Sequence, residues 1–406
     1  MNVVRRSAAA LAVTAVIGAA GVPAAQAASP SPSLPSGLYG TGDPTYDGVW
    51  RQSLALLAHD AVGVRPAAAG VEWLAGQQCA DGAFAPYRAD TAKPCDAKTP
   101  VDTNMTAAAV QALAALGGHD AVTGKAVTWL KSAQGKDGGW GYTAGGPSDA
   151  NSTSLVIGAL AAAGERPQDV VKGGRSAQDA LLAFAIPCDD AKGAGAFAYQ
   201  PDKKGALAAN PDATAAGVLG SLGKGLAAEA AGTAAAPSCA DGDDLTPERA
   251  AANGASYLAD ALAADGHLMS ALPGSEDQPD YGNTADAVVA LAAQGGAARA
   301  AGPLKWLERN AVAWAKQSGP AAYAQLILAA HAAGGDPRDF GGTDLVRLLN
   351  ASGPAPQSAQ RPATADSEAT SESDDGFGVW WYVGVCLVAG VGIGFLLSGR
   401  NRKQQP

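Results

Sequence analysis

Small apolar residues recur between residues 40 and 350 in two alternating patterns. One pattern carries Trp and charged residues on one side of a helical period, as in AVTWLKSAQGKDGGWGY (126 to 142). The other begins with Asp, Asn, Ser or Thr and continues with Ala, Leu and Val on all sides, as in DANSTSLVIGALAAAG (149 to 164). The first predicts an amphipathic helix, and the second predicts a helix that is buried on every face. One copy of each predicts a helix hairpin.

The two patterns repeat along the chain. The amphipathic copies lie at 71 to 87, 126 to 142, 180 to 199, 255 to 271 and 304 to 319, and the buried copies lie at 102 to 117, 149 to 164, 210 to 223, 281 to 296 and 319 to 335. A first helix is expected near Asp47 to Ala61 and a last near Thr343 to Asn350, which makes twelve helices. Polar residues at the helix starts and Gly at their ends are typical caps. The fold predicted is all-α, an α6/α6 toroid with the buried helices inside and the amphipathic ones outside.

The stretch WLKSAQGKDGGWGY (129 to 142), with the buried helix that follows it, resembles the prenyltransferase and squalene-oxidase repeat of terpenoid-cyclase-like toroids. The resemblance covers roughly residues 40 to 335 and concerns the fold. It implies that the glycine-rich aromatic turn is a corner between two helices. Gly138, Gly139 and Gly141 would let the backbone turn, while Gln134 and Trp140 would brace it against the next helix.

The same superfamily includes enzymes whose motifs can be sought here. Zinc-dependent prenyltransferases need His, Cys and Asp together, but none of the four His residues lies beside a Cys, so no metal site is expected. The Cys-Gly-Glu-Gln stretch of thioester domains is absent. Asp241, Asp243 and Asp244 match the acidic motif of class II cyclases and are the candidate catalytic residues. Because Thr246 and Pro247 follow as a helix start, at the end of the toroid opposite the glycine-rich corners, a loop is the preferred interpretation.

Polar residues gather where the buried helices begin. Many of them suit a cap of their own helix, but together they would line a concavity with an apolar wall, which is the usual form of a small-ligand site. The predicted ligand-binding residues are Tyr46, Asp47, Asp102, Asn104, Asp149, Asn151, Asp212, Tyr281, Asn283, Tyr323 and Gln325.

These features predict a ligand-binding protein rather than an enzyme, with no cofactor needed for folding. Among relatives the chain looks most like the α-domain of cobalamin carriers, which makes a bulky, amide-rich cofactor such as a corrinoid the leading ligand hypothesis. It departs from those carriers because no β-rich lid follows the toroid. A terpenoid-cyclase-like or sugar-cleaving enzyme that uses the toroid cleft, or a protein-binding surface scaffold, remain alternatives. The net charge of −10 and the pI near 4.9 argue against a nucleic-acid partner.

The two ends of the chain predict export and anchoring. Residues 1 to 27 combine Arg5 and Arg6 with an apolar run and a small-residue cleavage site, as in a signal peptide. Residues 28 to 39 are a linker before the toroid domain at 40 to 350, and residues 351 to 376 are a spacer rich in Pro, Ser and acids. Residues 377 to 398 are apolar enough to span a membrane, and a basic tail follows at 399 to 406. The expectation is a single-pass cell-membrane protein whose toroid lies outside and whose tail lies in the cytoplasm.

The cysteines agree with export. Cys386 falls in the predicted anchor, which leaves an even set of four: Cys79, Cys95, Cys188 and Cys239. Three pairings are possible, and sequence separation favours Cys79 with Cys95 and Cys188 with Cys239, because each bond would close one long connection. The absence of CxxC spacing disfavours a zinc site.

Overall fold

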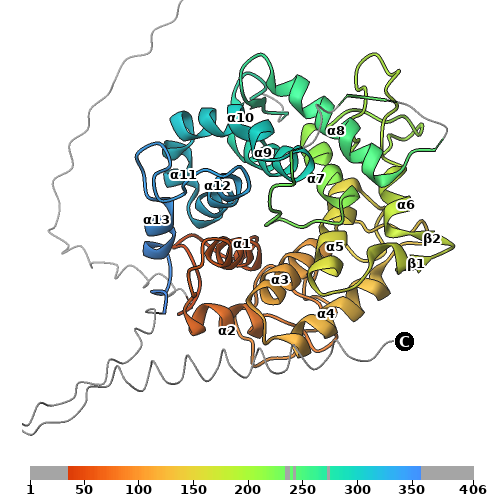
Figure 1. Cartoon of the computed structure of the whole chain (residues 1–406). Helices are drawn as coiled ribbons and strands as arrows, with labels where there is room; N and C mark the ends of the chain where they lie inside the picture. Colours follow the sequence, from red (N-terminus) through yellow and green to blue (C-terminus); the bar gives the residue numbers. More distant parts are fainter. Residues whose placement is uncertain (1–34, 234–237, 241–243, 272–274, 358–406) are drawn as a thin grey trace, which may run out of the picture. The chain divides into compact units, whose positions relative to one another are not determined.

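The inner layer of the protein is a closed ring of helices. The computed structural model describes residues 35 to 233, 238 to 240, 244 to 271 and 275 to 357 (Figure 1). The inner helices are α1 (Gly48–Ala61), α3 (Thr103–Leu116), α5 (Ala150–Ala162), α7 (Pro211–Ser221), α9 (Tyr281–Gly295) and α12 (Pro320–Ala332). Each packs against the next, and α12 packs against α1. The predicted all-α toroid is confirmed.

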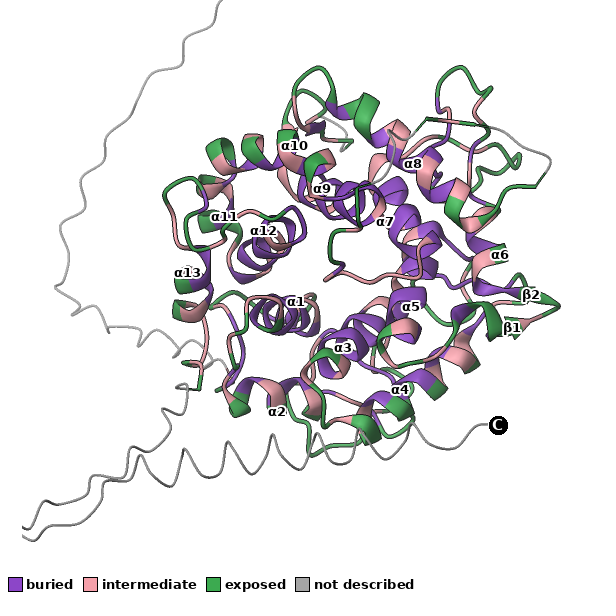
Figure 2. Ribbon diagram, viewed as in Figure 1, coloured by how far each residue is buried: buried purple, intermediate pink, exposed green. Residues whose placement is uncertain are grey.

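The inner helices pack on every side because their side chains are small. In α12, Ala322, Ala324, Ala329 and Ala330 are all buried although they point in different directions around the helix. Alanine lets neighbouring helices approach closely and leaves few polar groups to satisfy. Figure 2 shows this ring as almost continuously buried, with exposed residues in the surrounding layer, the loops and the C-terminal ends of some inner helices.

The outer layer is less regular than the sequence predicts. Its helices are α2 (Ala68–Gly76), α4 (Asp120–Ala133), α6 (Ala177–Leu182), α8 (Pro247–Leu262), α10 (Ala297–Asn310), α11 (Val312–Ser318) and α13 (Leu345–Ala351). The helix expected at 304 to 319 is two helices, and the bend between them lets Trp306 and Trp314 both stack on Tyr281. The copy at 180 to 199 is helical only at its start, since Pro187 cannot continue a helix.

Short extended segments complete the described part of the chain. A 3₁₀ turn, η1 (Pro167–Asp169), precedes the hairpin formed by β1 (Val171–Lys172) and β2 (Arg175–Ser176). A second antiparallel pair joins β3 (Leu268–Met269) to β4 (Pro279–Asp280), with Leu268 opposite Asp280. Both pairs lie in connections between helices and leave the toroid unchanged.

The glycine-rich corner has the structural role expected of it. Gln134 Nε2 donates to the carbonyl oxygens of Gly138 (2.8 Å) and Val170 (3.0 Å), and Trp140 Nε1 donates to that of Leu130 (2.7 Å). Gly138 has a φ of +87°, and a Cβ there would lie 2.5 Å from the Ser176 carbonyl oxygen. The corner therefore joins α4 to α5 and holds the next connection against them.

Contacts distant in sequence close the outer layer. The Gly40 amide donates to the Ser352 carbonyl oxygen (2.7 Å), and His59 Nε2 lies 2.8 Å from Asn350 Oδ1. The predicted disulfides are confirmed, with Cys79 bonded to Cys95 and Cys188 bonded to Cys239. The Cys79–Cys95 bond closes the connection between α2 and α3, whereas the Cys188–Cys239 bond joins the connections on either side of α7.

The predicted signal peptide (1 to 27), most of the linker and spacer, the membrane span (377 to 398) and the basic tail lie outside the described residues. Within the described residues, no helix has the length and apolar character needed to cross a membrane. Export and anchoring therefore stay predictions from the sequence.

Candidate functional site

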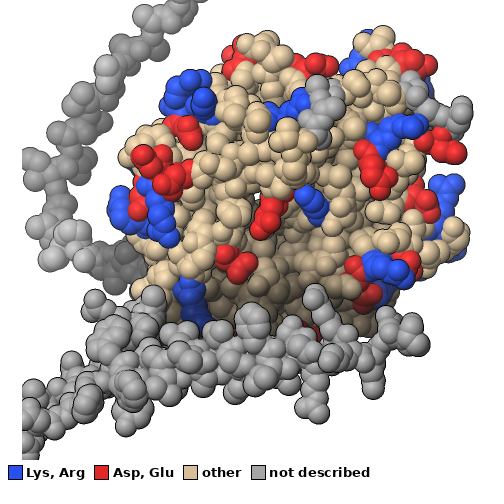
Figure 3. Space-filling view, in the orientation of Figure 1, with Lys and Arg blue, Asp and Glu red and all other residues tan. Residues whose placement is uncertain are grey.

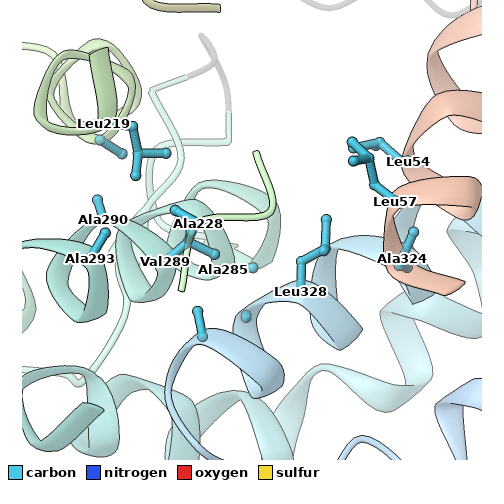
Figure 4. Packing of buried hydrophobic residues seen from close by; sticks show 14 of the residues in the cluster. Leu54, Leu57, Leu219, Ala228, Ala285, Val289, Ala290, Ala293, Ala324 and Leu328 are labelled. Atoms are coloured by element: carbon cyan, nitrogen blue, oxygen red, sulfur yellow. The ribbon is translucent and has the colours of Figure 1, made fainter. Parts of the chain in front are cut away.

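A cavity of about 270 Å³ lies at the centre of the inner ring. Side chains from all six inner helices line it, together with the loop that follows α7. Its apolar wall is formed by Trp50, Leu54, Leu155, Leu219, Val289 and Leu328, and its polar groups belong to Asn104, Gln111, Asn151, Ser154, Asp212, Lys224, Asp286 and Gln325. Figure 4 shows Leu54, Leu219, Val289 and Leu328 around the central space. Such a concave, largely apolar wall with a few polar groups is typical of a small-molecule site.

Polar residues at the helix starts either cap the helix or line the cavity, and their position relative to the N-cap decides which. Asp149 accepts hydrogen bonds from the Ser152 amide (2.7 Å) and the Ser152 hydroxyl (2.9 Å), so it caps its own helix. Two residues further on, Asn151 lines the cavity. The same order recurs where Asp102 caps α3 and Asn104 lines the cavity, and where Asn210 caps α7 and Asp212 lines it. In each of these three helices, the residue two positions after the N-cap therefore lines the cavity.

A second polar layer lies one turn deeper. Asp286 and Gln325 each lie six residues after the N-cap position of their helix, and Gln325 Nε2 is 3.2 Å from Asp286 Oδ2. In the outer polar layer, Asn151 Nδ2 donates to Asp212 Oδ2 at 2.6 Å. Two carboxyl groups therefore share the cavity, and each accepts a hydrogen bond from a side-chain amide.

Burial makes both carboxyl groups harder to ionise. It raises the pKa of Asp286 to about 7, and the negative charge of Asp212 adds to the effect. Burial also raises the pKa of Asp212, against the lowering effect of the Asn151 amide, and the charges of Asp280 and Asp149 raise it further. Neighbouring carboxyl charges thus add to the effect of burial at both groups.

Several oxygen atoms on the cavity wall have no partner. Among the described residues, eight buried side-chain nitrogen or oxygen atoms lack a hydrogen bond, and three of them line this cavity: Asn104 Oδ1, Asn151 Oδ1 and Ser154 Oγ. Ser154 is only 4% exposed. A buried polar atom without a partner costs about 1–3 kcal/mol, so three such atoms around one space point to a ligand or ordered water that would satisfy them.

The opposite end of the cavity is closed by the loop after α7. Gln111 Oε1 accepts a hydrogen bond from the Leu226 amide (2.8 Å), and Lys224 Nζ donates to the carbonyl oxygens of Glu229 (3.2 Å) and Ala293 (3.3 Å). A Cβ on Gly225 would lie 2.3 Å from Gln111 Oε1, so glycine lets this loop approach the inner ring. Polar groups of the loop are thus used to hold it in place.

Four of the eleven predicted ligand-binding residues line the cavity, namely Asn104, Asn151, Asp212 and Gln325. Asp102 and Asp149 cap their helices, while Asp47 forms an ion pair with Arg51 (3.5 Å). Asn283 donates to Asp280 from its side chain (2.7 Å). The three remaining residues are tyrosines that lie elsewhere: Tyr46 is 82% exposed, Tyr281 stacks on tryptophan rings, and Tyr323 is buried at 8% exposure.

Most of the cavity-lining residues were not among the predicted ligand-binding residues. Asp286 is the most informative of these, because it is a charged residue inside a helix that is otherwise apolar, and that contrast could have identified it. Trp50 and Ser154 fall at inward positions that a helical period alone does not distinguish from packing positions. Lys224 reaches the cavity through the fold of a loop, for which the sequence carries no spacing signal.

The one described residue of the candidate acidic motif, Asp244, is not part of the cavity lining. Asp241 and Asp243 are outside the described residues, and Asp244 is exposed just before α8. Thr246 accepts a hydrogen bond from the Arg249 amide (3.3 Å) and caps α8 as predicted. No cluster of His, Cys, Asp or Glu suited to a metal ion occurs in the part of the chain that the structure describes.

The charge distribution gives no sign of a nucleic-acid surface on the face shown in Figure 3. Most of that face is uncharged, and basic and acidic atoms are interspersed around its edge and beside the central hollow. A nucleic-acid site would need basic groups gathered together. The view agrees with the net charge of −10 for the whole chain.

Comparison with known proteins adds little about chemistry. No family model matches the chain, and no curated protein matches it in sequence. Two solved structures are similar: an ent-copalyl diphosphate synthase from Streptomyces platensis, at 18% identity and a TM-score of 0.43, and a protein from Actinoplanes, at 16% identity and a TM-score of 0.32. The matches cover 70% of this chain and 50% of the synthase, and 69% of this chain and 99% of the Actinoplanes protein. The expected likeness to terpenoid-cyclase-like toroids holds for the helical fold, which the closed ring itself shows.

Proposed function

We propose that this protein is a binding protein that holds a small molecule in the central cavity of the toroid. The observation that carries the proposal is the central cavity itself, whose lining includes three residues, Asn104, Asn151 and Ser154, that each have a buried oxygen atom without a hydrogen-bond partner. Binding proteins supply such atoms for ligand recognition, whereas folding alone selects against them.

The size of the cavity favours a compact ligand. Sites for drug-sized molecules usually measure about 300–1,000 Å³, and this cavity of about 270 Å³ is slightly smaller. A corrinoid would have to lie across the mouth of the ring with only a side group inside. We therefore favour a small ligand over a corrinoid, while keeping the extracytoplasmic, membrane-anchored setting as part of the proposal. Two disulfides support an oxidising compartment.

Thermal denaturation of the full chain against a panel of small molecules, cobalamin, isoprenoid diphosphates and oligosaccharides would test the proposal. A ligand at a hundred times its dissociation constant stabilises the fold by about 2.7 kcal/mol. Ala216 lines the cavity, so Ala216→Phe should fill the space and abolish the shift, whereas Ala298→Phe, on the exposed side of α10, should keep it. A shift that survives Ala216→Phe would move the site elsewhere and contradict the proposal.

An enzymatic function is the second candidate, and the pair Asp212 and Asp286 favours it. A carboxyl group with a pKa of about 7 can donate or accept a proton near neutral pH, which is the property of a general acid or base. This pair, rather than the acidic stretch before α8, is the one that could act on a molecule in the cavity. Turnover of a bound panel member that is lost in Asp286→Asn, with binding retained, would establish catalysis.

A further inference from the structure

The cavity-lining residues include two carboxyl groups and two amide oxygen atoms without a partner, all of which are hydrogen-bond acceptors, and the Ser154 hydroxyl can also accept. Asn104 Oδ1, Asn151 Oδ1 and Ser154 Oγ have no partner, and the carboxyl oxygens of Asp212 and Asp286 lie in the same cavity. The side-chain amides of Asn151 and Gln325 already donate to these two carboxyl groups. A ligand that complements this wall must therefore bring several donors of its own.

In the part of the chain that the structure describes, no Lys or Arg forms an ion pair with Asp212 or Asp286. Lys224 lines the cavity, but its ammonium group donates to the carbonyl oxygen of Ala293, seven residues beyond Asp286 on α9. Seven residues of helix correspond to about 10 Å along the axis. Arg51 is directed elsewhere, because it donates to the Gly42 carbonyl oxygen (2.8 Å) and pairs with Asp47. The negative end of the cavity is thus left for a ligand to neutralise.

The remaining, apolar part of the cavity wall determines which chemical groups the rest of the ligand can carry. Leu54, Leu155, Val289 and Leu328 form an apolar lining, which favours a body without further polar groups. Trp50 lines the same space, and the face of an indole ring attracts a cation. A positive charge, several hydrogen-bond donors and an apolar body occur together in one simple chemical class.

We propose that the cavity recognises a small primary ammonium ion with a compact apolar body, whose N–H groups are bound by Asn104, Asn151, Ser154 and the carboxylates of Asp212 and Asp286. This inference rests on the proposed binding function and adds the class of ligand. A primary ammonium carries three donors, whereas a quaternary ammonium carries the same charge and none. An uncharged alcohol supplies one donor and leaves both carboxyl groups without a counter-charge.

The test compares four probes of similar size on the full chain: n-butylammonium, n-butyltrimethylammonium, 1-pentanol and pentanoate. Their dissociation constants come from isothermal titration calorimetry at neutral pH. n-Butylammonium should bind at least about tenfold more tightly than each of the others. Asp286→Asn should weaken it at least about tenfold as well, and Asp265→Asn, an equal change of charge at an exposed position, should leave its affinity unchanged.

Two results would overturn the inference and separate it from the proposed function. If pentanol or pentanoate binds as well as n-butylammonium and Ala216→Phe abolishes that binding, the cavity is a binding site but not for a cation. If the trimethyl compound matches n-butylammonium, the charge is recognised without the N–H groups. Absence of binding by all four probes would refute the ammonium class, and the broader panel with Ala216→Phe would still decide whether the cavity binds anything.

Discussion

The two ends of the inner ring are built from the same six helices but differ in how their polar groups are satisfied. At the C-terminal end, hydrogen bonds within the protein hold the loop after α7. Lys224 donates to the Ala293 carbonyl oxygen, and the Leu226 amide donates to Gln111 of α3. At the N-terminal end, the helix caps satisfy the backbone, yet Asn104 and Asn151 still have unpaired oxygen atoms. The C-terminal end also has two unpaired atoms, Ser221 Oγ and Gln294 Oε1, but neither residue lines the cavity. The unpaired atoms of Asn104 and Asn151 belong to cavity-lining residues, which supports the proposed binding site.

The largest expected effect concerns the corners that lead into the N-terminal end. Trp140→Ala should lower the free energy of unfolding by about 3–5 kcal/mol, because the indole is 1% exposed and donates to the Leu130 carbonyl oxygen. Urea denaturation would measure the loss. Trp129→Ala, which removes a half-buried indole from α4, is the matched control and should cost less. Equal losses would mean that the corner is not a special point of support.

The next effect concerns the charge inside the N-terminal half of the cavity. The pKa of Asp286 is about 7 in the folded protein and near 4 in an unfolded chain, so the folded state binds more protons between these values. Stability should fall as the pH rises from about 4 to 7 and level off above it. Asp286→Asn should remove part of that slope and raise the stability at pH 8 by roughly 1–3 kcal/mol.

Asp265→Asn is the control for this pH dependence, because Asp265 is exposed. Thermal denaturation of both variants across the pH range would measure the difference. If Asp286→Asn followed the wild-type curve at every pH, the carboxyl group would be ionised without cost, and the account of the cavity electrostatics would be wrong.

The smallest effects separate caps from cavity residues. Asp149→Ala should lower the free energy of unfolding by about 1–2 kcal/mol, since it removes the bonds to Ser152. Asn104→Leu should not lower stability and should raise it by up to about 1–3 kcal/mol, because it removes a buried oxygen atom that has no partner. Chemical denaturation can resolve the two values. A loss for Asn104→Leu as large as that for Asp149→Ala would assign Asn104 to the fold instead.

The architecture could be predicted because it depends on local patterns. Caps such as Asp149 and Thr246, the bracing of the corner by Gln134 and Trp140, and the alternation of buried and amphipathic helices all follow from short stretches of sequence. The disulfide pairing was also predicted, but only Cys79–Cys95 closes one connection as expected, since Cys188–Cys239 spans α7.

The cavity could be predicted only in part. Helix starts gave the right region, but a cap and a residue two positions later have the same polar character, and only the orientation of the helix separates Asp149 from Asn151. Asp286 and Lys224 line the cavity only because the tertiary fold brings them there. Asp286 lies in the second turn of a helix, and Lys224 lies in a folded loop. The irregular outer layer depends on packing partners such as Tyr281, which no local pattern reveals.

A crystal structure of the full chain, grown with n-butylammonium and at a resolution that shows ordered solvent, would test the central claim most directly. The account predicts a bound molecule in the ring, with nitrogen atoms within hydrogen-bond distance of Asn104 Oδ1 and Asn151 Oδ1 and a carbon chain against Leu328 and Val289. The account would be contradicted if those oxygen atoms were paired with protein groups and the space were filled by side chains. Hydrogen bonds within the protein would then account for the polar groups of the N-terminal end.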